Sequence, residues 1–320
     1  MNHLFERDFT DDILKEICGK FGLPPENASL IKEDSNLIYD CGESILRISH
    51  SAIRGREVIL TELEWMQYLL SKEVSVVGII PSQGGHLLES VEGASCYFTA
   101  VLFVKVIGSK ISKPTWKEPL FIELGCLAGR IHRVSKHYPR EKRQKFQHWD
   151  ELIEFGYFSF LPEDEREFKQ LYQRLVAEFN GYPRSEENYG LIHNDIHYGN
   201  YLLTGAGNKV VLFDFEVACR SWYMYEISTV LYYASQVKGQ RNNPDFEQLF
   251  LASFSEGYRR ERSLGPIDFE VILKFMLYRD LFLIGYVNSI WRQGVMTEPR
   301  LNLIDSMEAS VAVRRQRLGW

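Results

Sequence analysis

Two short polar segments carry the side-chain types that phosphoryl transfer requires. The first reads His-Asn-Asp-Ile-His-Tyr-Gly-Asn over 193–200, and the second reads Asp-Phe-Glu from Asp214. Phosphoryl transfer needs a carboxylate, here Asp195, that orients the attacking hydroxyl group and accepts its proton. Magnesium prefers hard oxygen ligands, which Asn200 and Asp214 supply. We therefore expect phosphoryl-transfer chemistry here; the alternative is that these polar residues only cap turns.

A hairpin is expected to bring the two segments together. The runs 201–203 and 210–213 are typical of short strands, and the turn Thr-Gly-Ala-Gly-Asn over 204–208 separates them. Paired strands would place Asn200 and Asp214 side by side. Asp195 would then lie one loop away and face a substrate.

The first part of the chain predicts a small sheet. Short strand-like runs occupy 28–32, 36–41, 44–49, 76–80, 86–90 and 95–104. Helical spacing of apolar residues predicts helices over 11–21 and 55–72. We expect an antiparallel, strand-rich lobe over 1–104 with one embedded helix that follows its third strand.

Helical periodicity dominates the rest of the chain. The segment 105–119 contains two prolines and one glycine and is the expected linker between lobes. Beyond it, helices are expected over 120–137, 146–155, 163–180, 223–237, 246–259, 268–291 and 301–317. The sequence thus predicts an α+β protein whose second lobe, 105–320, is helical and carries the hairpin.

Composition excludes several classes of protein. The chain has 320 residues, 45% of them hydrophobic and 25% charged, which excludes intrinsic disorder. The formal net charge of −6 argues against nucleic-acid binding. Five cysteines without a Cys-x-x-Cys pair favour reduced thiols, and no leader is recognisable at the start of the sequence. We expect a cytoplasmic protein with no membrane segment, because Arg279 and Asp280 interrupt the longest apolar run.

The order of these motifs resembles the aminoglycoside phosphotransferase and choline kinase superfamily. The helix that contains Leu-Ala-Gly-Arg-Ile-His132 is similar to the first helix of that superfamily's second lobe. The tripeptides His-Asn-Asp and Asp-Phe-Glu are similar to the corresponding sequence motifs of choline kinases. Glu226 stands where the family has an aspartate that supports the catalytic loop. The resemblance covers most of the chain and implies a two-lobed fold like that of protein kinases.

The resemblance also implies roles for individual residues. Asp195 would be the catalytic base, Asn200 and Asp214 would hold magnesium, and His193 would brace the loop. For His197, a substrate-side role and a partly exposed loop position remain equal alternatives. The implied cofactors are ATP, or GTP, and Mg²⁺.

Kinase chemistry also needs a cation on the third strand, paired with a helix glutamate. Arg47 is the candidate in place of the usual lysine, and arginine can clamp a phosphate with two nitrogens. The resemblance implies Glu62 as the partner, because the family's spacing to the leucine at the end of the helix, here Leu69, favours it; Glu64 and Glu57 are competitors. Exposed positions on the strand and the helix are the alternatives.

No glycine-rich phosphate loop is present. Ser35 and Asn36, in a short polar turn between the first strands, are candidates to donate hydrogen bonds to phosphate, although an ordinary turn explains them equally well. Adenine would dock on backbone groups near Val104 and Val106.

The expected acceptor is a hydroxyl group of a small molecule, which carboxylates beside aromatic rings would suit if it is cationic. For each single candidate a core or surface position is favoured over a ligand role; the candidates are Trp149, Asp150, Glu154, Trp222, Tyr225, Asp280 and Trp291. The sequence does not define the oligomeric state or the particular acceptor, such as an aminoglycoside, choline or homoserine.

The sequence therefore predicts a small-molecule kinase, dependent on ATP and magnesium. A nucleotide-binding scaffold without turnover is the alternative, because Arg47 replaces lysine and the glycine loop is missing. A protein kinase is disfavoured because no Ala-Pro-Glu segment and no extended loop follow Asp214.

Overall fold

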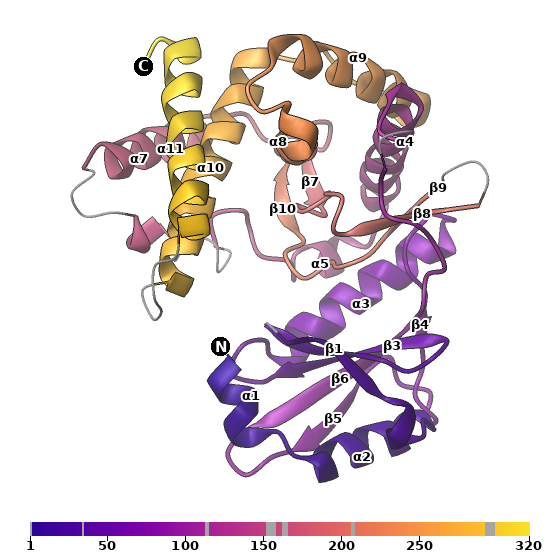
Figure 1. Cartoon of the computed structure of the whole chain (residues 1–320). Helices are drawn as coiled ribbons and strands as arrows, with labels where there is room; N and C mark the ends of the chain where they lie inside the picture. Colours follow the sequence, from indigo (N-terminus) through magenta and orange to yellow (C-terminus); the bar gives the residue numbers. More distant parts are fainter. Residues whose placement is uncertain are drawn as a thin grey trace. The chain divides into compact units, whose positions relative to one another are not determined.

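A computed structural model describes residues 2–33, 35–112, 115–151, 158–161, 166–205, 209–291 and 298–320. The chain divides into two compact units. The first unit comprises residues 1–109 and 202–216, and the second comprises 110–201 and 217–320. The predicted fold class is confirmed, with an antiparallel sheet early in the chain and a mostly helical remainder (Figure 1).

An antiparallel sheet forms the first unit. Its main order is β1-β2-β3-β6-β4, and β5 also pairs with β6. Alternation along β3 sends Leu46 and Ile48 into the apolar core of one face and directs Arg47 to the opposite face. The strands are β1 Ser29–Glu33, β2 Asn36–Asp40, β3 Ser44–His50, β4 Ile79–Ile80, β5 Glu89–Glu92 and β6 Tyr97–Val104.

Helices cover both faces of this sheet. Helix α2, Asp11–Phe21, packs Ile17 and Phe21 onto the apolar face together with Phe5 of the short helix α1, Asn2–Asp8. Helix α3, Arg56–Ser71, lies over the other face (Figure 1). The backbone of α2 is capped at both ends, by the Thr10 hydroxyl and by Gly22 at φ 67°. A short 3₁₀ turn, η1 Pro25–Asn27, leads into β1.

The hairpin of β8, Tyr201–Thr204, and β9, Lys209–Leu212, packs with the first unit rather than with the helical part of the chain. Ser109 and Leu203 exchange both backbone hydrogen bonds at 2.9 Å. Leu212 donates to Ser75 at 3.0 Å and accepts from Val77 at 2.8 Å. These long-range bonds join the hairpin to residues 75–109. They explain why the hairpin belongs to the first compact unit, although its place in the chain suggested the helical part. A boundary between functional lobes at residue 104 stays a prediction.

The second unit is built from helices around one small sheet. Strands β7, Tyr189–Ile192, and β10, Cys219–Trp222, pair antiparallel. The helices are α4 Glu118–Ser135, α5 Arg140–Arg143, η2 Phe158–Phe160, α7 Arg166–Asn180, α8 Tyr223–Gln236, η3 Val237–Gly239, α9 Pro244–Glu261, α10 Phe269–Trp291 and α11 Glu298–Leu318. Helices α4 and α9 run side by side (Figure 1). Gly125 and Gly257 permit this approach, because a β-carbon on either would meet a backbone oxygen of the other helix at 2.0 Å or less.

One predicted helix is wrong over its described part. Residues 146–151 of the expected helix 146–155 form turns and a bridge between His148 and Arg220, and residues 152–155 lie outside the described part. The sequence also missed α1, β7 and β10, which are short. Among the described helices, none has the length and apolar character needed to cross a membrane.

Candidate active site

The loop after β7 is held by one buried carboxylate. Glu226, in the first turn of α8, accepts hydrogen bonds from the backbone amides of His193 at 2.7 Å and Asn194 at 2.8 Å. Asn194 has a φ of 69°, an uncommon conformation for a residue other than glycine. Two hydrogen bonds to one buried carboxyl group hold that conformation. The Glu226 carboxylate therefore makes the loop-supporting contact despite the departure from aspartate.

Asp195 follows on this loop, and both of its carboxylate oxygens have partners. Oδ1 lies 2.6 Å from Nη2 of Arg279, and Oδ2 accepts from Nδ2 of Asn200 at 2.9 Å. His197 Nε2 lies 3.2 Å from Oδ2. Burial acts to raise the pKa of Asp195, but the His197 hydrogen bond and the Arg279 charge outweigh it and lower the pKa to about 2. Asp195 is therefore an ionised carboxylate at neutral pH.

The neighbouring side chains fix the geometry of Asp195. His197 Nδ1 accepts a hydrogen bond from the Gly199 amide, so its Nε2 carries the proton that points at Asp195. The Asn200 side chain donates through Nδ2 to Asp195, and its Oδ1 accepts no hydrogen bond from the described residues. That oxygen is suited to a hard cation. His193 is fully buried, and its Nδ1 accepts from the Asp195 amide at 3.2 Å, a contact consistent with a bracing role.

In the first unit, the structure brings Arg47 and Glu62 together. Arg47 Nη1 lies 3.0 Å from Glu62 Oε1, and both side chains are buried. Arg54 Nη1 lies 2.8 Å from the other Glu62 oxygen. Burial acts to raise the pKa of Glu62, yet the two arginines outweigh it and lower that pKa. Nε and Nη2 of Arg47 are buried without a hydrogen-bond partner among the described residues, which leaves both donors for an anion.

The Asp214-Phe215-Glu216 segment belongs to the same unit. Asp214 is exposed and has a φ of 67°, while Phe215 is buried with its ring edge-to-face on Trp65 at 5.4 Å. Glu216 Oε1 lies 3.3 Å from Arg47 Nη1, so the segment is tied to the arginine cluster. Phe215 and Glu216 thus anchor the positive-φ backbone that presents Asp214.

The residues predicted to contact the nucleotide differ in how many of their polar groups already form hydrogen bonds within the protein. Asn36 donates to Glu216 at 2.5 Å and accepts from Ser49 at 2.5 Å, so its amide is already used within the protein. Ser35 accepts a weak bond from Asn36 at 3.3 Å. The Val104 amide donates to Gly78, whereas the backbone of Val106 makes no hydrogen bond to a described residue.

Most of the acceptor-pocket candidates prove to be core residues. Trp149, Trp222 and Tyr225 are each 3% exposed or less and belong to one aromatic core. Asp280 is fully buried and paired with Arg314. Burial raises the pKa of Asp280 against the opposing effect of that arginine. Asp150 is half-buried. Glu154 and the Trp291 side chain lie outside the described residues.

Sequence reasoning missed two arginines that the structure places at these sites. Arg279 lies on α10, is 2% exposed and contacts both Asp195 and the Tyr233 hydroxyl at 2.9 Å. A charged pair in the middle of an apolar helix was the available signal, because buried charges require partners. Arg54 gave no signal, since it lies in a turn after β3.

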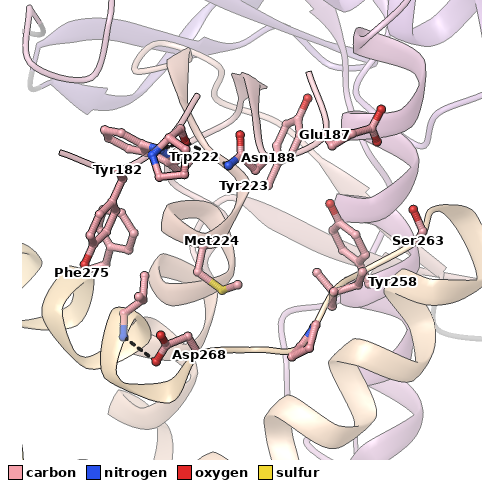
Figure 2. Close-up of a pocket in the computed structure, with 15 residues that line it drawn as sticks. Tyr182, Glu187, Asn188, Trp222, Tyr223, Met224, Tyr258, Ser263, Asp268 and Phe275 are labelled. Atoms are coloured by element: carbon pink, nitrogen blue, oxygen red, sulfur yellow. Dashed lines mark hydrogen bonds between the residues drawn. The ribbon is translucent and has the colours of Figure 1, made fainter. Parts of the chain in front are cut away.

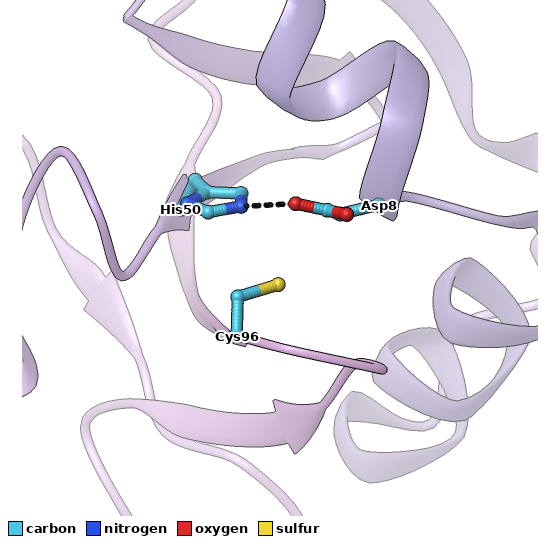
Figure 3. A group of neighbouring side chains, drawn as sticks. All are labelled: Asp8, His50 and Cys96. Atoms are coloured by element: carbon cyan, nitrogen blue, oxygen red, sulfur yellow. Dashed lines mark hydrogen bonds and ion pairs between the residues drawn. The ribbon is translucent and has the colours of Figure 1, made fainter.

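A third group, near the amino terminus, has the side-chain types of a metal site. Asp8, His50 and Cys96 bring three potential ligand atoms within 4.8 Å of one another (Figure 3). The Ala52 amide donates to His50 Nδ1 at 3.0 Å, so Nε2 carries the proton and donates to Asp8 at 3.2 Å. Arg7 holds both oxygens of Asp8. This hydrogen bonding opposes a cation, because a metal would need the Nε2 lone pair.

Comparison with known proteins defines the class. The model of the family described as "Phosphotransferase enzyme family" matches residues 35–264, and the chain belongs to that family. The expectation of a phosphotransferase of the kinase class, with a kinase-like fold, is thereby confirmed.

Individual kinases are similar to the chain in sequence or in fold. The chain is 28% identical over 305 residues to amicoumacin kinase of Bacillus subtilis (strain 168). The aligned region covers 92% of this chain and 89% of the relative. The chain shares the fold of an amicoumacin kinase solved with AMP-PNP, Ca²⁺ and Ami, with a TM-score of 0.90 and 24% identity over 98% of this chain and 96% of the other. A microcompartment-associated aminopropanol kinase has a TM-score of 0.75 and 21% identity over 96% and 97%.

Proposed function

We propose that the protein transfers the γ-phosphoryl group of ATP, or of GTP, to a hydroxyl group of a small molecule, with Mg²⁺ as the divalent ion. The observation that carries this proposal is Asp195, an ionised carboxylate on a loop whose backbone is fixed by Glu226. Family membership supports the reaction class.

Asp195 is proposed to orient the acceptor hydroxyl and to receive its proton. A carboxylate with so low a pKa is a weak base, but phosphoryl transfer proceeds through a loose transition state in which positioning matters most. His197 and Asn200 fix the plane of the carboxylate. They reduce the orientational freedom that the reacting groups would otherwise have to lose.

Asn200 and Asp214 are the proposed ligands of the divalent ion. Asn200 offers an amide oxygen without a described donor, and Asp214 offers an exposed carboxylate; each is a hard oxygen donor of the kind that Mg²⁺ prefers. When bound, the ion supplies positive charge that neutralises the phosphate oxygens. Arg47 is proposed to hold phosphate through Nε and Nη2, while Glu62 fixes its other end. Val106 offers its backbone to the base of the nucleotide.

The proposed acceptor is an amine-bearing compound with a free hydroxyl, and amicoumacin is the first to test. Support comes from the similarity to a named amicoumacin kinase over nearly the whole chain. Small amino alcohols form the second class, supported by the shared fold with an aminopropanol kinase.

The test is nucleotide consumption by the whole protein against these two classes of acceptor. We expect Asp195→Asn to lower kcat by about 10²–10⁴-fold while the Kd of the nucleotide changes little. Asp12→Asn, on the exposed face of α2, is the control that removes one carboxylate charge elsewhere. Nucleotide binding without turnover on any acceptor by the unaltered protein would favour a non-catalytic scaffold. Full activity of Asp195→Asn would refute the assigned base.

A further inference from the structure

The second unit contains a pocket that includes none of the residues assigned to phosphoryl transfer. Its volume is about 340 Å³, within the range of small-molecule sites. It lies where the first turns of α8 and α10 meet the loop that follows α9 (Figure 2). The residues used below are Trp222, Tyr223, Met224, Tyr258, Asp268 and Phe275.

Aromatic rings and a thioether form most of the pocket wall. Trp222, Tyr223 and Phe275 are buried, so their positions are fixed by the core behind them. Met224 is only partly buried, and in Figure 2 its sulfur lies between the rings and Asp268. Arg262 and Arg184 already lie over the Tyr223 and Trp222 rings, at 4.4 and 5.1 Å from the ring centroids, so the wall offers a ligand mainly apolar contact. Methionine adapts its shape to such a ligand.

The charged residues of the pocket have one sign. Its lining includes two carboxylates, Glu187 and Asp268, and contains no lysine, arginine or histidine. Glu187 is neutralised, because it is paired with Lys136 and with Arg262.

Asp268 is the carboxylate that remains available. Its Oδ1 accepts the Glu270 amide at 3.0 Å and the Val271 amide at 3.4 Å, which caps α10. Its Oδ2 has no hydrogen-bond or ion-pair partner among the described residues. The exposed Asp268 thus contributes one unpaired carboxylate oxygen to the lining of a pocket that is mostly apolar and aromatic, with Asn188 and Ser263 as further polar residues.

We propose that this pocket is a second ligand site, which binds a small organic cation with an apolar body. Such a ligand would place its ammonium group near Asp268 Oδ2 and its apolar part against Met224 and the aromatic wall. The volume of the pocket accommodates a single substituted ring. The proposal does not depend on the acceptor of the phosphoryl group.

Two residues of the pocket wall are linked to the catalytic loop through His132 and Glu226. The Tyr223 ring stacks on the buried His132 ring at 4.2 Å, and the Tyr258 hydroxyl lies 2.8 Å from His132 Nδ1. His132 Nε2 lies 3.5 Å from Glu226, which holds the loop amides. We therefore expect an occupant of the pocket to change kcat without competing with nucleotide or acceptor. This last step rests on the proposed kinase activity.

The binding experiment uses benzyltrimethylammonium as the probe, with benzyl alcohol and benzoate as neutral and anionic analogues. Calorimetry and saturation-transfer NMR on the full chain measure the affinity. We expect the cation to bind most tightly and Asp268→Asn to weaken it roughly three- to fivefold. Asparagine is also a good helix cap, so this change removes the charge while keeping α10 capped. Asp305→Asn, on the exposed face of α11, is the charge-matched control and should bind normally.

Two further variants separate this pocket from the active site. Met224→Trp should block the probe by filling the pocket, and Asp195→Asn should leave its affinity unchanged. Unaltered affinity in both Asp268→Asn and Met224→Trp, a loss of affinity in Asp195→Asn, or equal binding of benzoate would overturn the site. Binding that leaves kcat unchanged in an active enzyme would overturn the coupling. An inactive enzyme that still binds the probe would refute the proposed function alone.

Discussion

Arg47 shows how one substitution changes the chemistry of a phosphate site. A lysine offers a compact charge, whereas arginine offers five donors in a fixed plane. Arg47 uses Nη1 on Glu62 and Glu216 and keeps Nε and Nη2 for an anion. Its pKa is raised, because the two glutamates outweigh burial, which acts to lower it. The cluster keeps the guanidinium charged and oriented before any ligand arrives.

We predict that Arg47→Met lowers kcat/KM for the nucleotide by at least tenfold, and that Arg47→Lys is intermediate. The reason is that a charge-assisted hydrogen bond contributes about 1.5–3 kcal/mol, and methionine keeps the volume without the charge. Steady-state kinetics with varied nucleotide measures the change. Arg56→Met, at an exposed position of α3, serves as the control. Equal kcat/KM for Arg47→Met and the unaltered enzyme would rule out a phosphate role for Arg47.

Glu226 supports the catalytic loop through two backbone hydrogen bonds at a buried position. We predict that Glu226→Ala lowers the free energy of unfolding by more than about 2 kcal/mol, because it leaves two buried amides without acceptors. Glu226→Gln should have a smaller effect, since its amide oxygen still accepts one bond. Urea unfolding of the three proteins measures these differences. Equal stability of all three would show that the carboxylate does not hold the loop.

At the scale of elements, the closest contact is between α4 and α9. We predict that Gly257→Ala lowers stability by at least 1–3 kcal/mol, because its β-carbon would lie 1.9 Å from the Ile122 carbonyl oxygen. Gly19→Ala, in α2, meets nothing within 4 Å and should instead add up to about 1 kcal/mol. Thermal unfolding compares the two changes. Similar shifts in Tm of the same sign would contradict close packing at Gly257.

Long periodic elements could be predicted from the sequence, and so could the short hairpin strands β8 and β9, which a turn separates, but the short strands β7 and β10 could not. Helix α2 was predicted with its exact bounds, because apolar spacing, Thr10 and Gly22 all define it locally. Strands β7 and β10 have four residues each and are stabilised by pairing with each other. No local sequence pattern predicts such a pairing. The pairing of Arg47 with Glu62 followed from family spacing. The contact between Arg279 and Asp195 did not, since 84 positions separate them.

At the scale of the whole molecule, carboxylates determine the response to acid. The pKa of Asp8 is lowered to about 2 by its hydrogen bond from Arg7, and that of Asp195 also falls to about 2. Others with a lowered pKa are Asp40, Glu62, Glu89, Glu187 and Glu261. The folded protein therefore binds fewer protons than the unfolded chain between about pH 2 and 4.5.

We predict that Tm already declines a little between pH 7 and 5, because burial lowers the pKa of His132 and of His148, and that it falls steadily as the pH drops below about 4.5 toward 2. Stability from a lowered carboxyl pKa is present above the unfolded value and is lost as protons bind. The raised pKa of Asp280 opposes this trend but is a single group. Calorimetry at pH 7, 4 and 3 measures the profile. Asp8→Asn should flatten it, and an unchanged Tm at pH 3 would contradict the charge assignments.

The hairpin β8–β9 has a consequence for how the chain folds during synthesis. Residues 1–109 lack the strands that satisfy Ser75, Val77 and Ser109, so the first unit is incomplete until residue 216 has been made. At synthesis rates of about 5–20 residues per second, that interval lasts roughly 5–20 seconds. During this time the backbone groups of Ser75, Val77 and Ser109 and the ring of Trp65 lack the partners that residues 202–216 supply. The nascent chain would therefore need chaperones most between the synthesis of residue 109 and that of residue 216.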